Sequence, residues 1–176
     1  MNDQDFEKYI RWALDQSMDQ AVRIEPSSVV TAPWVRMKCQ FGCTGYGQRL
    51  CCPPFAPGYE VTRQVLESYE VILLLHSHRT PGDQKGMKKF NESLVDLEFQ
   101  AFLDGNHKAW SMGCGPCQLC KSCDTTKPCA NGKRARPSME ACGIDVYETA
   151  RKHGLPLKVA RTREEPWDMY GLLLLK

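Results

Sequence analysis

The chain has 176 residues, a formal net charge of +2 and ten cysteines. This length suits one domain that buries its own hydrophobic core, so we expect a single domain over residues 1–176. The small net charge does not indicate a nucleic-acid partner, because such a partner requires a basic surface. The longest apolar runs, residues 71–75 and 172–175, are much too short to span a membrane.

The N-terminal sequence MNDQDFEKYI is acidic and lacks the apolar segment of a secretory signal peptide. We therefore expect a cytoplasmic protein. Thiols stay reduced in the cytoplasm, so a dense set of cysteines there indicates metal binding or catalysis before it indicates disulfide bonds.

Three elements are predicted ahead of residue 69. Apolar residues in 4–21 recur at steps of three and four, which predicts an amphipathic N-terminal helix. Residues 28–35 contain several β-branched side chains and predict a strand, placed at a sheet edge by Pro33. A second helix is expected over 59–68, after Pro57 and Gly58.

A buried strand is predicted next, because YEVILLLHSH at residues 69–78 is a continuous apolar run of strand length. In chain order, the later elements are a helix over 83–103, a strand over 108–112, a helix capped by Asp145 and Glu148 and ending at 153–154, and strands over 157–161 and 169–175.

This order of elements predicts a mixed β-sheet covered by helices, in the α/β or α+β class. Two cysteine-rich segments interrupt it, residues 39–54 and 114–142. Both are expected to be loops at strand ends that bind a metal cluster.

The second cysteine segment begins CGPCQLCKSC, which places cysteines three residues apart at 114, 117, 120 and 123, with Cys129 further on. Such spacing wraps a short loop around one centre, with thiolates and backbone amides directed inward. An unbroken C-x2-C-x2-C run resembles the bacterial ferredoxin arrangement and favours a [4Fe–4S] cluster. Zinc is the alternative, although its C-x2-C pairs are normally separated by a longer finger or ribbon.

The first cysteine segment, CQFGCTGYGQRLCCPPF, offers Cys39, Cys43, Cys51 and Cys52 among many turn-forming residues. Neighbouring side chains point apart in an extended chain, so Cys51 and Cys52 are not expected to bind the same metal. We favour Cys52, the one followed by proline.

Three motifs together resemble a known family. They are C-x3-C-x2-YG-x4-CPP (39–54), GPC-x2-C-x2-C ahead of a PC dipeptide (115–129) and ARPSMEACGIDV (135–146). From residue 34 onward the chain is similar to the predicted metal-binding proteins catalogued as domain of unknown function 2284, which we associate with anaerobic bacteria and archaea. The resemblance implies a cytoplasmic, cysteine-rich metalloprotein of the iron–sulfur kind, with no reaction attached.

The resemblance also sorts the cysteines. Those on the family motifs are Cys39, Cys43, Cys52, Cys117, Cys120, Cys123 and Cys129, whereas Cys51 and Cys114 look additional. Cys142 is the natural eighth ligand for two clusters. One partition gives Cys117, Cys120, Cys123 and Cys129 to one cluster and Cys39, Cys43, Cys52 and Cys142 to the other. A competing partition groups Cys114, Cys117 and Cys120 with Cys52.

Three functions follow from these cysteines. The leading hypothesis is electron transfer to or from a redox partner protein in anaerobic metabolism, through one or two [4Fe–4S] clusters. If Cys142 is not a ligand, the first cluster has an open iron corner that can bind a small-molecule substrate and act as a Lewis acid. The third hypothesis is a zinc-stabilised interaction module. The residues leave open whether the chain is an enzyme.

Overall fold

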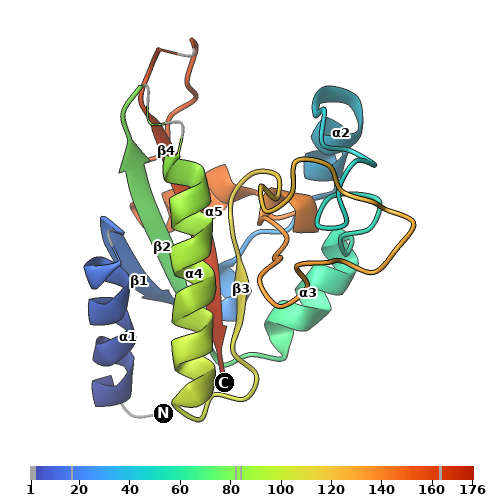
Figure 1. Cartoon of the computed structure of the whole chain (residues 1–176). Coiled ribbons are helices and arrows are strands. Elements are labelled where there is room, and N and C mark those ends of the chain that lie inside the picture. The colour runs from blue at the N-terminus through green and yellow to red at the C-terminus, as the bar shows by residue number, and fades with distance from the viewer. Residues whose placement is uncertain (1–2, 17, 82, 84, 163) are drawn as a thin grey trace.

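The computed structural model describes residues 3–16, 18–81, 83, 85–162 and 164–176. Figure 1 shows a β-sheet with helices packed against it and the cysteine segments gathered beyond one side of the sheet. The strands are β1 (Gln20–Ile24), β2 (Val71–Arg79), β3 (Trp110–Met112) and β4 (Trp167–Leu175). The helices are α1 (Asp3–Asp15), α2 (Pro33–Gly42), α3 (Tyr59–Glu67), α4 (Gly86–Leu103) and α5 (Val146–Lys152), with 3-10 helices η1 (Pro26–Ser28) and η2 (Glu140–Cys142).

The sheet has the strand order β1-β2-β4-β3 in the described ranges. The α+β class is confirmed, whereas the expected mixed pairing is corrected, because all three strand pairs are antiparallel. The last strand of the chain, β4, lies between β2 and β3. The β2–α4–β3 stretch is therefore a split βαβ unit, in which the two strands run in the same direction without being neighbours.

The central strand β2 explains why the molecule has two cores. Leu73 faces the core formed with α1 and α4, whereas Leu74 faces the core formed with α3, η2 and α5. Because successive side chains of a strand point to opposite faces, an unbroken leucine run fits only a strand covered on both sides. The predicted buried strand at 69–78 is confirmed by β2.

The N-terminal helix is shorter than the expected 4–21. It ends at Asp15, and residues 20–24 form β1, paired with β2. Met18 and Ala21 pack on the same core as α1, as predicted. However, Met18 lies in the connection after the helix, and Ala21 lies in β1. The β-branched Val22 and Ile24 favour a strand, and β2 offers the backbone groups with which this strand pairs.

Residues 28–35 do not form the expected strand. Pro33 starts α2 instead, at the first helical position, where its fixed φ is favourable and its missing N–H costs nothing. Pairing with another strand is limited to an isolated bridge between Thr31 and Ile144. The first cysteine segment consequently begins inside a helix, with Cys39 on α2, and becomes a loop only at Cys43.

The expected strand at 157–161 is absent as well. Leu157 and Val159 instead line a cleft. Their alternation with charged residues suits the wall of a cleft as well as it suits a half-buried strand, so the pattern alone could not separate the two.

Several boundaries agree with the sequence. The carboxylate of Asp145 accepts a hydrogen bond from the Glu148 amide at 3.0 Å, as the capping pattern predicted for α5. Gly105 and Gly154 follow α4 and α5 with positive φ, which ends each helix. None of the helices in the described ranges is long and apolar enough to span a membrane.

Candidate metal centre

The two cysteine segments lie side by side, although they are far apart in the sequence (Figure 1). Arg49 of the first segment donates from Nη1 to the carbonyl oxygen of Cys120 in the second, at 3.2 Å. A Cβ atom built on Gly45 would lie 3.6 Å from Cβ of Pro116, so the backbones approach closely there. The fold thus brings both sets of thiols into one region.

The second segment is a long loop closed at its neck. Gly113 and Ser138 form a bridge, the Gly113 amide donates to Pro137 O at 3.0 Å, and the Met139 amide donates to Gly113 O at 2.9 Å. Between these points residues 114–137 form no helix or strand. A loop of this length without regular structure is unusual in a compact fold unless it has a function.

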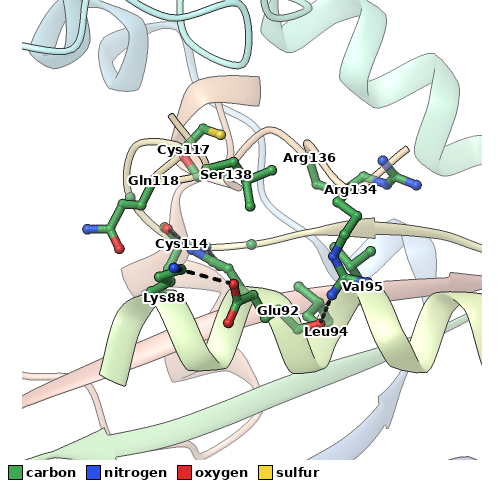
Figure 2. Close-up of a pocket in the computed structure, with 14 residues that line it drawn as sticks. Lys88, Glu92, Leu94, Val95, Cys114, Cys117, Gln118, Arg134, Arg136 and Ser138 are labelled. Carbon is green, nitrogen blue, oxygen red and sulfur yellow. Dashed lines mark hydrogen bonds and ion pairs between the residues drawn. The ribbon is translucent and has the colours of Figure 1, made fainter. Parts of the chain in front are cut away.

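Helix α4 fixes the start of this loop. The Asn91 side chain donates to Cys114 O at 2.9 Å and accepts from the Cys114 amide at 3.0 Å. The glycines on either side allow this approach, because a Cβ on Gly113 would clash with Asn91 and one on Gly115 with Met87. Figure 2 shows Cys114 against α4 and the Cys117 sulfur directed away from the helix.

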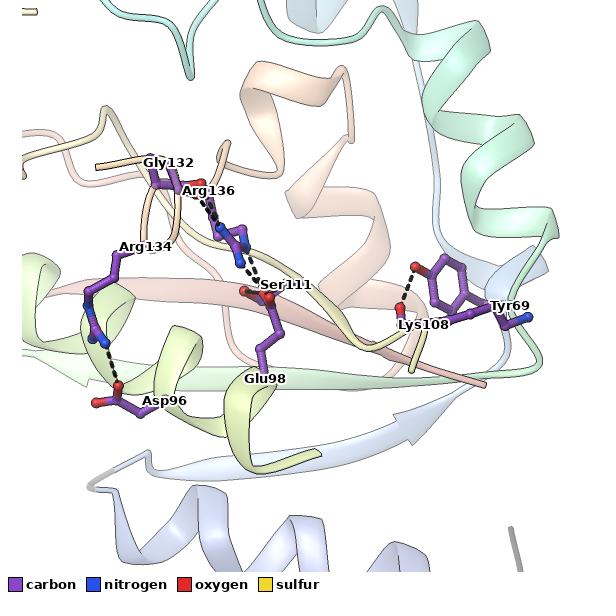
Figure 3. A network of polar contacts seen from close by, with 9 residues as sticks. Tyr69, Asp96, Glu98, Lys108, Ser111, Gly132, Arg134 and Arg136 are labelled. Carbon is purple, nitrogen blue, oxygen red and sulfur yellow. Dashed lines mark hydrogen bonds and ion pairs between the residues drawn. The ribbon is translucent and has the colours of Figure 1, made fainter. Parts of the chain in front are cut away.

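A buried ion pair fixes the end of the loop (Figure 3). Arg136 makes two bonds to Glu98 of α4, at 2.5 and 2.7 Å, and both side chains are about nine-tenths buried. Glu98 also accepts from the amide and hydroxyl of Ser111, and the Arg136 guanidinium lies 4.2 Å from the centre of the Trp110 ring. The network ties the loop, the helix and β3 together, and every oxygen of the buried carboxylate has a donor.

The first thiol group comprises Cys39, Cys43 and Cys52. A Cβ atom on Gly45 would lie 3.5 Å from the Cys43 sulfur and 3.6 Å from the Cys52 sulfur, so the two sulfurs flank this glycine. The Gly45 amide donates to the Cys43 sulfur at 3.4 Å. Cys39 lies within 3.9 Å of the Glu140 carbonyl oxygen. A Cβ atom at this position would make ordinary van der Waals contact with both sulfurs.

Burial and neighbouring thiols both disfavour ionisation of Cys39 and Cys52. Burial raises the pKa of Cys39, and the nearby Cys43 raises it further. Burial likewise raises the pKa of Cys52, with added repulsion from Cys43 and Cys39, while the Arg49 guanidinium opposes this. Neighbouring thiolates repel one another, so a bound cation stabilises such a site.

The second thiol group comprises Cys51, Cys117 and Cys129. A hydrogen bond from the Cys51 thiol lowers the pKa of Cys117 to about 6, helped by the Leu119 amide and Arg49. That same bond, with burial and the neighbouring Cys117 and Cys129, raises the pKa of Cys51. In the same loop, Asn131 donates from Nδ2 to the Cys120 sulfur at 3.0 Å, and Cys123 is half-buried.

Two cysteines belong to the hydrophobic cores. Cys142 is fully buried with Met139 and Ile144 on the α5 side of the sheet, and burial raises its pKa to about 12. Cys114 packs with Phe90 on the α4 side, and burial raises its pKa too. Cys142, the predicted eighth ligand, is the last residue of η2 and packs in the core, whereas Cys39, Cys43 and Cys52 line a cleft.

A cleft of about 1040 Å³ opens onto the first thiol group. All three of its thiols line the cleft, and Cys142 is not among the described residues that do so. Aromatic side chains and both signs of charge complete the walls, including Trp34, Tyr46, Tyr147, Lys38, Arg151 and Glu140. Burial raises the pKa of the Glu140 carboxyl, and its Oε2 atom is buried without a hydrogen-bond partner.

Among the residues that the structure describes, no three His, Cys, Asp or Glu side chains are close enough together to hold one metal ion. A cubane makes a different demand, because each cysteine binds its own iron atom and the thiolates stay further apart than around one zinc ion. The two segments carry free thiols with amide, asparagine and arginine donors beside them.

Sequence reasoning missed three residues that shape this region, Arg49, Asn131 and Glu140, and set Cys51 aside as additional. Arg49 and Asn131 act through hydrogen bonds across the two segments, and no local pattern reports such bonds. For Cys51 and Glu140 the sequence does contain a recognisable signal. Cys51 directly adjoins a motif cysteine, and Glu140 is an acidic residue within the largely apolar MEACGI segment that the fold buries.

Comparison with known proteins agrees with this picture. No curated protein and no solved structure matches the chain. A family described as predicted metal-binding protein matches residues 22–175, a range that includes all ten cysteines. The chain therefore belongs to the predicted metal-binding protein family DUF2284.

Proposed function

We propose that the chain binds [4Fe–4S] clusters through its two cysteine segments and transfers electrons to or from a partner protein in anaerobic metabolism. The observation that carries this proposal is the placement of two groups of cysteine thiols beside each other, in segments about 70 residues apart in sequence. The family description supports metal binding. The iron–sulfur identity rests on the C-x2-C-x2-C run and on the donor set.

The ligands follow the two segments. Cys39, Cys43 and Cys52 hold the first cluster, and Cys142 stays the predicted fourth ligand. The cysteines of loop 114–137, at 117, 120, 123 and 129, hold the second cluster. When bound, such clusters accept and release single electrons without moving other atoms far.

The chain's own residues would tune and protect these centres. The amide of Gly45 and the side chains of Asn131 and Arg49 donate hydrogen bonds to, or lie beside, cysteine sulfurs, which stabilises their negative charge. On α2, Met37 and Phe41 are exposed next to Cys39 and Cys43 and offer a partner protein an apolar surface. The proposal places the chain in the cytoplasm, where its thiols stay reduced.

Metal analysis tests the proposal. After purification without oxygen, we expect about four irons and as many acid-labile sulfides per cluster, hence about eight of each per chain, with reversible bleaching by dithionite. A colourless protein with stoichiometric zinc and no sulfide would instead support the zinc-stabilised interaction module. The variant Leu103→Ala, at the exposed end of α4 and outside the residues that line the cleft, serves as a handling control.

The cleft favours a second candidate function. The three thiols of the first group line it, and Cys142, at the end of η2, is buried in the core instead. If Cys142 is not a ligand, the first cluster keeps an iron corner without a protein ligand, and the chain is an enzyme that binds a small sulfur- or oxygen-containing substrate there. A bound iron of this kind would supply Lewis acidity.

The variant Cys142→Ala separates the two candidates. Loss of one cluster's iron would identify Cys142 as the fourth ligand and support the electron carrier. Retention of all iron, together with a change in the electron paramagnetic resonance spectrum when cyanide is added to the reduced wild-type protein, would support the enzyme. Cyanide needs an open iron corner to bind, so an unchanged spectrum argues against the enzyme.

A further inference from the structure

Helix α2 turns its apolar stripe toward solvent. Trp34, Met37 and Phe41 follow one another at steps of three and four residues, which places their side chains on one face of the helix. Their exposed fractions are nevertheless 45%, 57% and 75%. A stripe of this kind normally faces a core, and an exposed one marks a surface that another molecule covers.

This stripe lies beside the first thiol group. Cys39 belongs to α2, and Cys43 is the C-cap residue of the helix. Trp34 lines the same cleft as these two cysteines. Figure 1 shows α2 at the end of the cysteine region that lies away from the sheet. A protein that covers the stripe therefore comes close to the thiols.

The chain around the thiols is also strongly basic. Residues 33–57 and 114–137 contain eight Lys and Arg and a single acidic residue, Asp124. The rest of the chain contains fifteen Lys and Arg against twenty Asp and Glu. The formal net charge of +2 therefore conceals a positive cysteine region and an acidic remainder.

The arginines of this basic region are engaged within the fold. Arg36 and Arg49 donate to backbone carbonyl oxygens at 2.6 and 3.2 Å, and Arg136 binds a buried carboxylate at 2.5 Å. Clusters bound by thiolates are negatively charged, and cations held inside the fold offset that charge. These arginines thus account for the interior share of the positive charge.

The lysines of the same region face solvent. Lys38, Lys121 and Lys133 are exposed, and none of them forms an ion pair within the part of the chain that the structure describes. The Lys38 ammonium lies 5.5 Å from the centre of the Trp34 ring, so it adjoins the apolar stripe. Lys121 directly follows Cys120, whose carbonyl oxygen is hydrogen-bonded to the first segment. An apolar stripe with exposed charges has the composition of a protein interface, which is apolar at its centre and polar at its rim.

We propose that α2 and the exposed lysines of the cysteine segments form the docking surface for an acidic electron-transfer protein. This inference rests on the proposed function and deepens it, because it names the charge of the partner and the face that receives it. Trp34, Met37 and Phe41 meet an apolar patch of the partner, and its carboxylates meet the lysines. One electron then passes between the partner's redox group and the metal centre, and no covalent bond forms or breaks.

Other occupants suit this surface less well. Two copies of the chain docked through α2 would bring like charges together, which costs affinity. A nucleic-acid strand could stack on the aromatic rings, but its backbone requires a continuous run of cations, whereas most of the arginines here are engaged within the fold.

Two redox proteins of opposite charge test the proposal on the metal-loaded, full-length protein. They are a flavodoxin of net negative charge and a cytochrome c of net positive charge, with electron exchange followed by stopped-flow absorbance. The rate constant with flavodoxin should fall as the ionic strength rises from about 0.01 M to about 1 M, because the Debye length shrinks from about 30 Å to about 3 Å. The rate constant with cytochrome c should rise over the same range. The reverse pattern would overturn the proposal.

Charge reversal locates the surface. The double variant Lys121→Glu/Lys133→Glu should lower the low-salt rate constant with flavodoxin about tenfold, which lies within the range that electrostatic steering supplies. Lys152→Glu/Lys158→Glu is the matched control, because it changes the net charge equally at exposed lysines outside the two basic ranges. This control should retain most of the wild-type rate. Equal losses in both double variants would show that net charge acts without a defined surface, and would refute the proposal.

The apolar stripe is tested through affinity. Phe41→Ser should weaken the binding of flavodoxin, measured by calorimetry, about tenfold while the dependence on salt persists. Phe102→Ser, at an exposed position on α4, is the control and should bind as the wild type does. Unchanged affinity in Phe41→Ser would contradict a role for the stripe. Self-association of the wild type that Phe41→Ser abolishes, or tighter binding of an oligothymidylate than of flavodoxin, would assign the face to a different occupant and overturn the proposal.

Failure of this proposal and failure of the proposed function give different results. A protein that contains zinc and no sulfide, yet binds flavodoxin with the expected salt dependence and loses it in Lys121→Glu/Lys133→Glu, would refute the iron–sulfur function and retain the docking surface. An iron–sulfur protein that exchanges electrons with flavodoxin at a rate independent of salt and of these lysines would retain the function and refute the docking surface.

Discussion

The sheet and the cysteine segments of this protein are held together by different interactions. Strands β2 and β4 bury leucines on both faces, and every residue of Ile72–Leu75 and Leu172–Leu175 is fully buried. Loop 114–137 has no helix or strand and depends on its closed neck, on Asn91 and on the Arg136–Glu98 pair. Hydrophobic burial gives the first region its order, whereas the second has few apolar side chains to bury.

This difference suggests what the metal does for the structure. A loop that cannot bury enough apolar surface gains order from metal–thiolate bonds, and binding then contributes directly to folding. The sheet requires no such contribution. We infer that metal loss disorders the cysteine segments and leaves the sheet folded.

Metal removal is expected to have the largest effect. Treatment with a chelator and oxidant should make Lys121, Lys127 and Lys133 in loop 114–137 sensitive to trypsin, because the thiols lose their common ligand. Lys88 and Lys89 on α4 should stay protected, and the far-ultraviolet circular dichroism should change little. Cooperative unfolding of the whole chain would contradict the division into two regions, as would an unchanged resistance of the loop.

Glu98→Gln should have the next largest effect, because it breaks the link between the two regions. Removing one partner of a buried ion pair typically costs about 3–5 kcal/mol, since the remaining charge of Arg136 stays buried without compensation. Urea unfolding measures this loss. Asp96→Asn is the matched control. It breaks the half-exposed pair of Asp96 with Arg134 and should cost below about 1 kcal/mol. Equal losses would show that the Glu98 network does not join the regions.

Leu173→Ala tests the sheet alone. Leu173 is fully buried opposite Leu73, so truncation should lower the free energy of unfolding by about 2–5 kcal/mol. The metal content per folded chain should not change. Loss of metal from protein that remains folded would mean that the two regions are more strongly coupled than their contacts indicate.

His153 gives the smallest effect, and it depends on pH. Burial lowers the pKa of His153, with a further contribution from Lys152, and the Ser28 hydroxyl lies 2.9 Å from Nε2. A depressed histidine pKa means that the folded state binds a proton less readily than the unfolded state. Stability should therefore fall as the pH drops below about 6.5, the unfolded value. His153→Gln should reduce this fall in thermal melts, whereas His107→Gln, at an exposed position, should not.

The sequence predicted the sheet better than it predicted the centre. A run such as Tyr69–His78 has one good solution, a strand buried on both faces, and Asp145 and Glu148 mark a helix start by local hydrogen bonds alone. The errors arose where two local solutions compete. Pro33 suits a sheet edge and a helix start equally, and residues 20–24 follow a helical stripe until a neighbouring strand is available to pair with them.

The cysteine partition was less accessible because it depends on contacts across the chain. From spacing we predict that Cys51 and Cys52 bind different metals, because adjacent side chains of an extended chain point apart, and this stays a prediction. Spacing could not show that Arg49 reaches Cys120, because that hydrogen bond is made by the packing of two segments about 70 residues apart. Burial of Cys142 likewise depends on the position of η2 against the sheet.

The central claim is that these thiols bind two iron–sulfur clusters, and Mössbauer spectroscopy of protein loaded with iron-57 without oxygen tests it most directly. We predict spectra of [4Fe–4S] type from two clusters, with half of the signal lost in Cys117→Ser. Iron present only as isolated thiolate-bound ions, or no bound iron beside stoichiometric zinc, would contradict the account.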